Sequence, residues 1–281
     1  MKIAVLSGKG GTGKTLIAVN LAALGHDALY LDCDVEEPNG HLFLKPKNPK
    51  EKEVFVKIPQ VDNELCDGCR KCVDFCAFNA LAYVKERLVV FEDICHSCGG
   101  CVLLCPQKAF SEKDKPIGKI VSGSWGSVDI HSGFMNVGEA SGVPLITELL
   151  SIGRENDDAL TFIDCPPGSA CIVMESIQDA DFCVLVAEPT IFGAHNLSMV
   201  YELVKLFDKP MGVVLNKCRR GSPNPSEDFC HENKIKILGS IPFDTQLGLL
   251  NSNAKIAVEE SPHFKELFSD LFEKIKEEAT K

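Results

Sequence analysis

Residues 8–15 read Gly8-Lys9-Gly10-Gly11-Thr12-Gly13-Lys14-Thr15 and satisfy the pattern G-x-x-x-x-G-K-[ST] of a phosphate-binding loop. The apolar run Lys2 to Ser7 before it predicts a strand, and Leu16 to Leu24 after it predicts a helix that ends at Gly25. Glycines let backbone N–H groups surround phosphate oxygens, and the helix N-terminus adds partial positive charge. The stretch therefore predicts a nucleotide site in an α/β fold.

Two side chains of this loop have expected roles in binding ATP and Mg²⁺. Lys14 is expected to reach the β- and γ-phosphates, and the Thr15 hydroxyl is expected to hold Mg²⁺. A glycine-rich turn without a ligand would not require both residues in register, so the nucleotide interpretation is favoured over a structural turn.

Three further apolar stretches each end in polar residues. Residues 28–31 lead into Asp32-Cys33-Asp34, and residues 213–215 lead into Asn216-Lys217. Residues 160–163 lead into Asp164-Cys165-Pro166-Pro167-Gly168. Each stretch predicts a buried strand that delivers its polar residues to one end.

The loop K-G-G-x-G-K-T, with its extra Lys9, resembles the deviant Walker A motif of the MinD, ParA, Mrp and nitrogenase iron protein superfamily of P-loop ATPases. The resemblance covers essentially the whole chain. It implies an α/β fold with a mostly parallel sheet, and a dimer in which Lys9 reaches across to the nucleotide of the partner.

The same resemblance implies roles for residues outside the loop. Asp34 would lie in switch I and position the attacking water, while Asp164 would be the Walker B residue in the Mg²⁺ shell. The Gly168 N–H would sense the γ-phosphate. Asn216 and Pro242 would flank the adenine. Catalysis would then rest on Lys9, Lys14, Asp34 and Asp164, and nucleotide binding on Gly8, Lys9, Gly10, Gly11, Thr12, Gly13, Lys14, Thr15, Gly168, Asn216 and Pro242. Glu188 either belongs to this site or ends a buried strand.

Eight cysteines form two copies of one motif, C-x2-C-x2-C-x3-C. The first copy is Cys66, Cys69, Cys72 and Cys76, and the second is Cys95, Cys98, Cys101 and Cys105. Each member of the second copy follows its counterpart by 29 residues, which indicates an internal duplication. The spacing is that of bacterial ferredoxins with two [4Fe–4S] clusters, and the closest likeness of the chain is to MinD-like ATPases with such a domain inserted.

In this motif the fourth cysteine of each copy binds the other cluster. Three thiolates on a tight turn can reach three irons of one cube, whereas the fourth points away. The expected ligands are Cys66, Cys69, Cys72 and Cys105 for cluster 1, and Cys95, Cys98, Cys101 and Cys76 for cluster 2. Pro106 follows Cys105 as the motif expects, whereas Ala77 follows Cys76.

Zinc and disulfide bonds explain these cysteines less well. Zinc takes four ligands per site and leaves the third cysteine of each run unexplained. Disulfide bonds need an oxidising compartment. Iron–sulfur binding is therefore favoured.

The chain is expected to divide into an ATPase domain in two parts, residues 1–60 and 113–281, with a small α+β ferredoxin-like insert at residues 61–112, after switch I. Lys45 to Lys52 predicts an exposed loop and Val54 to Ile58 a strand. Ala82 to Phe91 predicts a hairpin between the two cysteine motifs.

The second part of the ATPase domain is expected to complete the sheet. Ile120 to Phe134 predicts short antiparallel strands at a sheet edge, and Phe182 to Ala187 and Met211 to Leu215 predict buried parallel strands. Phe264 to Ile275 is amphipathic; its acidic polar face favours packing on the sheet over binding to a membrane.

The composition favours a cytoplasmic protein that binds no nucleic acid. The formal net charge is −11, no run of about 18 apolar residues predicts a membrane span, and the first strand leaves no room for a signal peptide. Fourteen cysteines suit a reducing compartment. Of the six outside the motifs, most are expected in the core; Cys171 is a candidate for a cluster that bridges a dimer, although no second cysteine suits it.

These features predict a dimeric ATPase, slow and stimulated by its partner, that passes electrons through two clusters to a redox protein or metalloprotein. The dimer is either a homodimer or a pair with a related ATPase. The alternative is ATP-dependent assembly or delivery of a metal or iron–sulfur cluster. A spatial organiser of the MinD or ParA type is disfavoured by the acidic surface.

Overall fold

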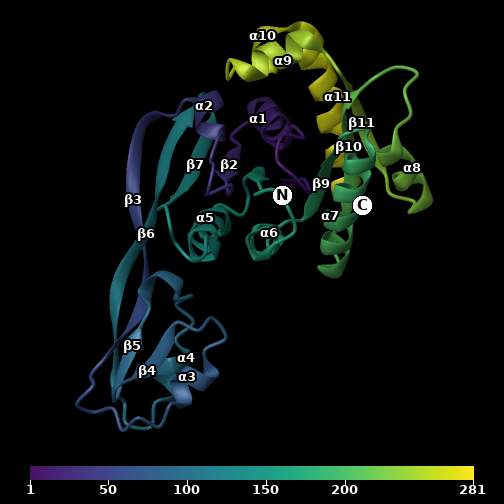
Figure 1. Cartoon of the computed structure of the whole chain (residues 1–281). Helices are drawn as coiled ribbons and strands as arrows, with labels where there is room; N and C mark the ends of the chain where they lie inside the picture. Colours follow the sequence, from purple (N-terminus) through teal and green to yellow (C-terminus); the bar gives the residue numbers. More distant parts are fainter.

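The continuous apolar runs of the sequence form the centre of one nine-stranded sheet. A computed structural model describes residues 1–281 and orders the strands β11-β10-β9-β1-β8-β2-β7-β6-β3 (Figure 1). β1 (Lys2–Leu6), β8 (Thr161–Asp164) and β9 (Phe182–Ala187) are almost wholly buried. Strands with helices on both faces need apolar side chains on both, which is why these runs do not alternate.

Most neighbouring strands of this sheet run parallel. Pairing is parallel from β11 (Ile237–Pro242) and β10 (Met211–Cys218) through to β2 (Leu29–Asp32) and β7 (Val128–Met135). The last two strands, β6 (Phe110–Trp125) and β3 (Lys47–Val61), are paired antiparallel. The α/β fold with a mostly parallel sheet is therefore confirmed.

Helices cover both faces of the sheet and bury two apolar cores (Figure 1). On one face lie α1 (Lys14–Leu24), α9 (Thr245–Ser252), α10 (Ala257–Glu260) and α11 (Pro262–Ala279). On the other lie α5 (Val143–Glu155), α6 (Cys171–Ile177), α7 (Ile191–Leu206) and α8 (Pro225–Glu232). α11 buries Phe264, Phe268 and Ile275, so the expected packing of this segment on the sheet is confirmed. None of the helices has the length and apolar character needed to cross a bilayer.

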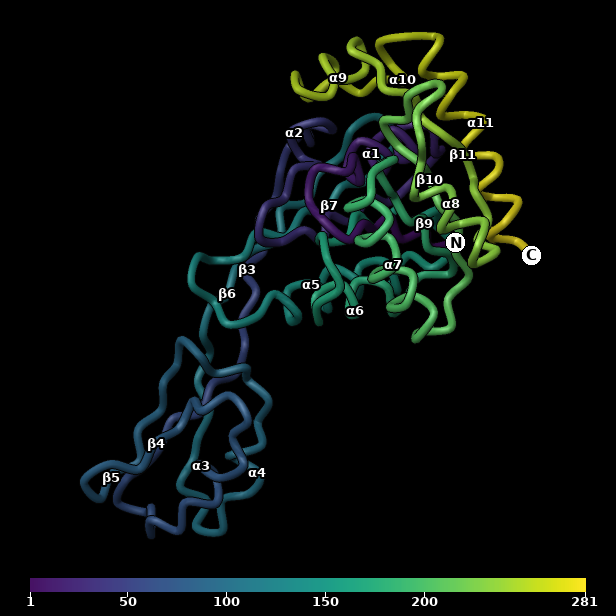
Figure 2. The backbone as a smooth tube through the Cα atoms, turned by 45° about the vertical axis from the view of Figure 1, so that its right-hand side comes forward, coloured from purple at the N-terminus to yellow at the C-terminus, as the bar shows by residue number.

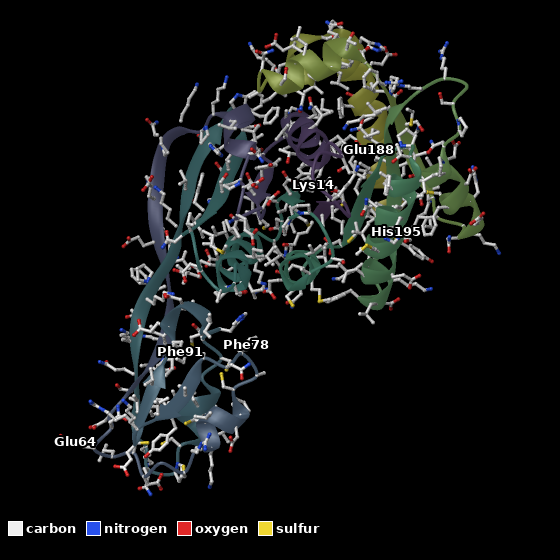
Figure 3. The ribbon with its side chains drawn as sticks, viewed as in Figure 1. Lys14, Glu64, Phe78, Phe91, Glu188 and His195 are labelled. Carbon is white, nitrogen blue, oxygen red and sulfur yellow. The ribbon has the colours of Figure 1, made fainter.

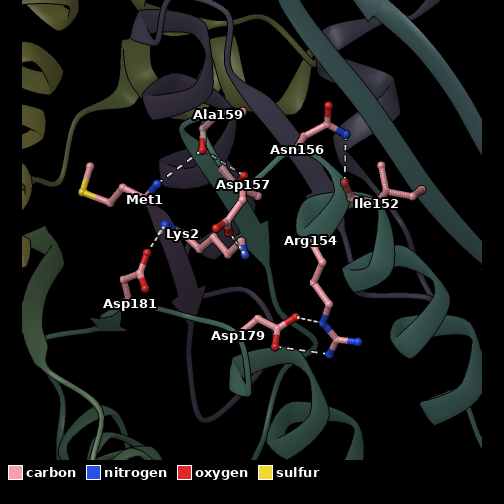
Figure 4. A network of polar contacts seen from close by, with 10 residues as sticks. Met1, Lys2, Ile152, Arg154, Asn156, Asp157, Ala159, Asp179 and Asp181 are labelled. Atoms are coloured by element: carbon pink, nitrogen blue, oxygen red, sulfur yellow. Dashed lines mark hydrogen bonds and ion pairs between the residues drawn. The ribbon is translucent and has the colours of Figure 1, made fainter.

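Ion pairs anchor the end of the sheet opposite the polar strand ends (Figure 4). The Lys2 backbone N–H donates to Asp181, and its ammonium lies 2.7 Å from Asp157. Arg154 donates two hydrogen bonds to Asp179, at 2.6 and 3.2 Å. The contacts of Lys2 hold the start of β1, the strand that leads into the glycine-rich loop, and the Arg154–Asp179 pair joins α5 to the turn after α6.

β3 and β6 continue beyond the sheet as a two-stranded ribbon that carries a small distal lobe (Figure 2). We call residues 62–109 the distal lobe and the rest the body. The lobe contains α3 (Lys71–Phe75), the hairpin β4 (Leu81–Val84) and β5 (Arg87–Val90), η1 (Glu92–Ile94) and α4 (Gly100–Leu104). Its own small core includes Cys72, Leu81, Leu88 and Cys101. The body also contains α2 (Gly40–Leu44), just before β3.

Two sequence-based expectations near the ribbon are wrong. Lys45 to Lys52 is not a loop, because β3 begins at Lys47; its residues up to Glu53 are exposed, so the strand has no apolar alternation to reveal it. The strands around Ile120 to Phe134 are antiparallel and lie near the sheet edge as expected, but they are not short, since β6 extends over 16 residues and crosses the expected boundary at residue 112. Backbone pairing between β3 and β6 continues along the ribbon, where Ile58 and Ile117 are also buried.

Candidate functional site

The glycine-rich loop joins β1 to α1 and leaves backbone N–H groups free at the helix N-terminus. Gly11 and Gly13 have φ of 77° and 97°, in the left-handed region that favours glycine. The first N–H groups of a helix have no partner within it. In α1 no side chain caps them, so they remain available to a ligand. Gly8 is required for another reason: a Cβ there would lie 2.2 Å from the carbonyl oxygen of Asn196.

Lys14 meets both carboxylates that the sequence assigned to the same site. Its Nζ lies 2.7 Å from Oδ1 of Asp164 and 3.4 Å from Oδ2 of Asp34, and its side chain is only 6% exposed. Burial acts to lower the pKa of Lys14, but the charges of Asp164 and Asp34 outweigh it and raise the pKa above its ordinary value. The expected catalytic residues Lys14, Asp34 and Asp164 therefore lie together.

Tyr30 and Asp32 also belong to this buried network, and the sequence alone assigned no role to either of them. The Tyr30 hydroxyl donates to Oδ2 of Asp164 at 2.9 Å, and the Gly40 N–H donates to Oδ2 of Asp32 at 2.8 Å. Oδ1 of Asp32 is buried without a partner. Burial raises the pKa of Asp32 to about 8; the charge of Asp164 adds to this rise and Lys14 opposes it. The D-x-D pattern pointed to Asp32, whereas nothing in the sequence pointed to Tyr30.

Lys9 is paired within its own chain. Its Nζ lies 2.6 Å from one oxygen of Glu188, and the Nζ of Lys217 lies 2.6 Å from the other. Lys217 also donates to the Gly11 carbonyl at 2.7 Å. Burial would raise the pKa of Glu188, but hydrogen bonds from Lys217 and Lys9 hold it below its ordinary value. Glu188 therefore belongs to the loop's surroundings; the role of Lys9 across a dimer stays a prediction.

A cavity of about 760 Å³ opens above the loop and is large enough for a nucleoside triphosphate. Its lining includes Lys9, Lys14, Thr15 and Asp34, together with Asn216, Pro242, Phe243 and Leu247. Asn216 is buried and donates to the Thr12 carbonyl at 2.7 Å. The guanidinium of Arg219 lies 4.6 Å from the ring centroid of Phe243, an aromatic wall that the sequence did not reveal.

The loop has features that fit phosphate. The hydroxyl oxygen of Thr12 is buried without a partner, and the uncapped start of α1 adds unpaired N–H groups. Gly168 fits its expected role less directly. It does not line the cavity, and its N–H donates to the Ser7 carbonyl at 2.9 Å. Its role as a γ-phosphate sensor remains a prediction.

The distal lobe brings the eight motif cysteines together in two groups of four. One cavity is lined by Cys66, Cys69, Cys72 and Cys105, and another by Cys76, Cys95, Cys98 and Cys101. Each group thus contains one cysteine from the other motif. Backbone N–H groups of Ala80 and Ala109 donate to the sulfurs of Cys76 and Cys105, both at 3.3 Å.

The four thiols of each cavity are the donor set of an iron–sulfur cluster. No three His, Cys, Asp or Glu side chains converge closely enough to hold one metal ion. The second cavity has a volume of about 320 Å³ and apolar walls that include Phe75, Phe78 and Leu81. Four cysteine thiols in each cavity, with N–H groups donating to the sulfurs of Cys76 and Cys105, match the ligand set of a [4Fe–4S] cluster.

The other six cysteines differ in exposure. Cys33, Cys165, Cys183 and Cys230 are buried in the body, as expected, and Cys218 is half-buried. Cys171 is exposed at the first residue of α6.

Comparison with known proteins matches residues 3–256 to the CobQ/CobB/MinD/ParA nucleotide-binding domain. The chain belongs to this family. It is 55% identical over 311 aligned positions to an iron–sulfur cluster carrier protein of Pyrococcus horikoshii, covering 98% of this chain and 87% of the relative. It is also 32% identical over 280 residues to an uncharacterized protein of Methanocaldococcus jannaschii, covering 99% and 97%.

Solved structures confirm the fold of this member of the nucleotide-binding family. The septum site-determining protein MinD of Pyrococcus horikoshii, complexed with Mg-ADP, superposes with a TM-score of 0.59. The alignment covers 98% of this chain and 95% of that structure at 19% identity. This likeness confirms the fold, and the match of residues 3–256 to the family model confirms the membership that Lys9 and the glycine-rich loop led us to expect.

In this family member, Asp32 is expected to make stability depend on pH. Its pKa rises on folding from 3.8 to about 8, so the folded state binds the proton more tightly and loses stability as the pH rises between these values. Relative to Asp32→Asn, the wild type should lose up to about 1.4 kcal/mol per pH unit in its free energy of unfolding. Urea unfolding at several pH values measures this difference. A difference that does not vary with pH would contradict it; Asp158→Asn, at an exposed position, is the control.

Proposed function

We propose that this chain is an ATP-hydrolysing, dimeric switch protein that passes electrons through two [4Fe–4S] clusters to a partner protein. The observation that carries the proposal is the pairing of two four-cysteine cavities in the distal lobe with a phosphate-binding loop in the body. We assign the clusters to a ferredoxin-type insert, residues 61–112, within an ATPase domain formed by residues 1–60 and 113–281.

At the nucleotide site, each residue has a role that follows from its position. Lys14 would neutralise the charge of the β- and γ-phosphates, because it is the buried cation at the helix N-terminus. Thr15 and Asp164 would hold Mg²⁺. Asp34, which lines the cavity, would orient the attacking water. Asn216, Pro242 and Phe243 would contact the base, and Lys9 would leave Glu188 to reach the nucleotide of a second subunit.

In the lobe, the cysteines would hold clusters that supply one-electron chemistry. Cys66, Cys69, Cys72 and Cys105 would hold one, and Cys76, Cys95, Cys98 and Cys101 the other. Exposed apolar side chains near the second group, including Phe75, Phe78 and Leu103, suit a redox protein or metalloprotein as partner. The many thiols fit a cytoplasmic location, and the net charge of −11 disfavours nucleic acid.

A second candidate function is ATP-dependent assembly or delivery of a cluster. The name of the Pyrococcus relative, an iron–sulfur cluster carrier protein, favours it. The two functions differ in the fate of the iron, because a carrier gives its cluster away whereas an electron carrier keeps it.

Anaerobic EPR of dithionite-reduced protein tests the proposal, with and without Mg²⁺ and a non-hydrolysable ATP analogue. We expect signals from two interacting [4Fe–4S] clusters that change in shape or potential with the analogue. Incubation with an apo-protein acceptor, followed by iron analysis of both proteins, separates the alternative. Clusters that do not respond to nucleotide but move to the acceptor would favour delivery. A reconstituted protein without clusters would overturn both functions.

A further inference from the structure

The distal lobe touches the body at a second place besides the ribbon. A small hollow there is lined from the lobe by Cys95, His96 and Ser97, and from the body by Glu139, Ala140, Ser141 and Pro144. Figure 3 shows Phe78, which lines the second four-cysteine cavity, at the end of the lobe nearer the body, and Glu64 farther out. The second cavity therefore has a direct contact with the body.

One ammonium group holds the two sides of this contact together. Nζ of Lys115, in β6, lies 2.9 Å from Oε2 of Glu139, with side-chain exposures of only 18% and 12%. The same Nζ lies 3.9 Å from Oδ1 of Asp93 and donates to the Glu92 carbonyl at 3.4 Å. Glu92 and Asp93 belong to η1, which leads directly into Cys95. Lys115 is thus shared between the body and the segment before a motif cysteine.

The loop that carries Glu139, residues 136–142, is bound at its start to β6. The Asn136 N–H donates to the Ile117 carbonyl at 2.8 Å, and its side chain donates to the Pro116 carbonyl at 3.2 Å. These acceptors follow Lys115 in the strand. The start of the loop is therefore fixed relative to Lys115, so a movement of the rest of the loop changes the distance between Glu139 and Lys115.

Met135, just before this loop, and Gly142, at its end, both contact Val35 beside the nucleotide site. The Met135 N–H donates to the carbonyl of Val35, the buried residue after Asp34, at 2.9 Å. A Cβ at Gly142 would lie 2.7 Å from the side chain of Val35 and 3.7 Å from that of Ile172. Ile172 itself lines the nucleotide cavity. Close-packed contacts of this kind transmit displacements because the interior has no space to absorb them.

We propose that the Lys115–Glu139 ion pair is the joint through which the nucleotide site sets the position of residues 92–95 and of the second four-cysteine site. This inference rests on the proposed function. When Asp34 and the start of α6 rearrange around nucleotide, loop 136–142 moves with Val35 and Ile172. Lys115 then exchanges Glu139 for Asp93, which lies only 1 Å farther from Nζ. This exchange gives the joint two discrete arrangements, as a switch requires.

Hydrogen exchange of the cluster-loaded, full-length protein tests the joint. Backbone amides of residues 92–98 are compared with and without Mg²⁺ and a non-hydrolysable ATP analogue. We expect the analogue to change their exchange rates about fivefold in the wild type, and less than about twofold in Glu139→Gln and in Lys115→Gln. Lys113→Gln is the matched control, because Lys113 also pairs with Glu92, at 2.7 Å, but makes no ion pair with the body. It should respond like the wild type.

The possible results separate this inference from the proposed function. Calorimetric titration should show that all three variants still bind the analogue, with an affinity within about fivefold of the wild type, since none lines the nucleotide cavity and the coupling is reciprocal. Wild-type protein that binds the analogue without a change at residues 92–98 would overturn the joint alone. A change that persists in both Glu139→Gln and Lys115→Gln would also overturn it. Failure of the wild type to bind nucleotide would overturn the proposed function together with the joint.

Discussion

Replacing Cys105 with alanine is expected to remove the cluster beside the first cysteine motif, although Cys105 belongs to the second. Cys105 lines a cavity with Cys66, Cys69 and Cys72, so its loss takes one ligand from that site. The iron content should fall from about eight to about four irons per chain. The remaining EPR signal should be that of a single reduced cluster, without the broadening caused by a paramagnetic neighbour.

Pairs of substitutions decide whether the fourth ligands are exchanged. Cys105→Ala combined with Cys66→Ala removes two ligands from the same cavity and should still leave about four irons per chain. Cys105→Ala combined with Cys95→Ala removes one ligand from each cavity and should leave almost no iron. The opposite pattern would mean that each motif supplies all four ligands of its own cluster. Cys171→Ala, at an exposed cysteine in the body, should keep full iron content.

The turns that carry the glycine-rich loop and the cysteine motifs could be expected from the sequence, because the geometry of each turn is local. The glycine-rich loop and the cysteine motifs specify short turns whose residue types and spacing follow from what a phosphate or a cluster needs. Gly13, at a φ of 97°, shows this dependence, since few other residues would adopt that backbone. The buried strands could also be predicted, because a sheet with helices on both faces needs unbroken apolar runs in its strands.

The parts that escaped prediction depend on partners distant in the sequence. Nothing near Tyr30 indicates that its hydroxyl meets Asp164, 134 residues away. Lys115 and Glu139 look like ordinary surface charges until the ribbon and loop 136–142 are placed side by side. The length of β3 was also hidden, because its exposed half has no apolar pattern and depends on pairing with β6.

Replacing Lys14 with methionine is expected to abolish ATP hydrolysis and to destabilise the protein at the same time. Methionine fills a similar space but carries no charge, so Asp164 and Asp34 lose the cation that lies 2.7 and 3.4 Å from them. Leaving a buried carboxylate unpaired costs about 3–5 kcal/mol in the free energy of unfolding. Loss of the cation that faces the phosphates should lower kcat by at least about 10²-fold.

A second substitution separates these two effects. In Lys14→Met combined with Asp164→Asn, the buried site holds neither the lysine nor the Asp164 charge. The free energy of unfolding, measured in urea, should therefore return most of the way to the wild-type value. Hydrolysis should stay lost, because neither the phosphate-facing cation nor the expected Mg²⁺ carboxylate is restored. Lys57→Met, at an exposed pair with Asp114, controls for the removal of a lysine as such. A folded Lys14→Met protein that hydrolyses ATP within about tenfold of the wild-type rate would exclude Lys14 from the chemistry, because removing one such charge costs far more.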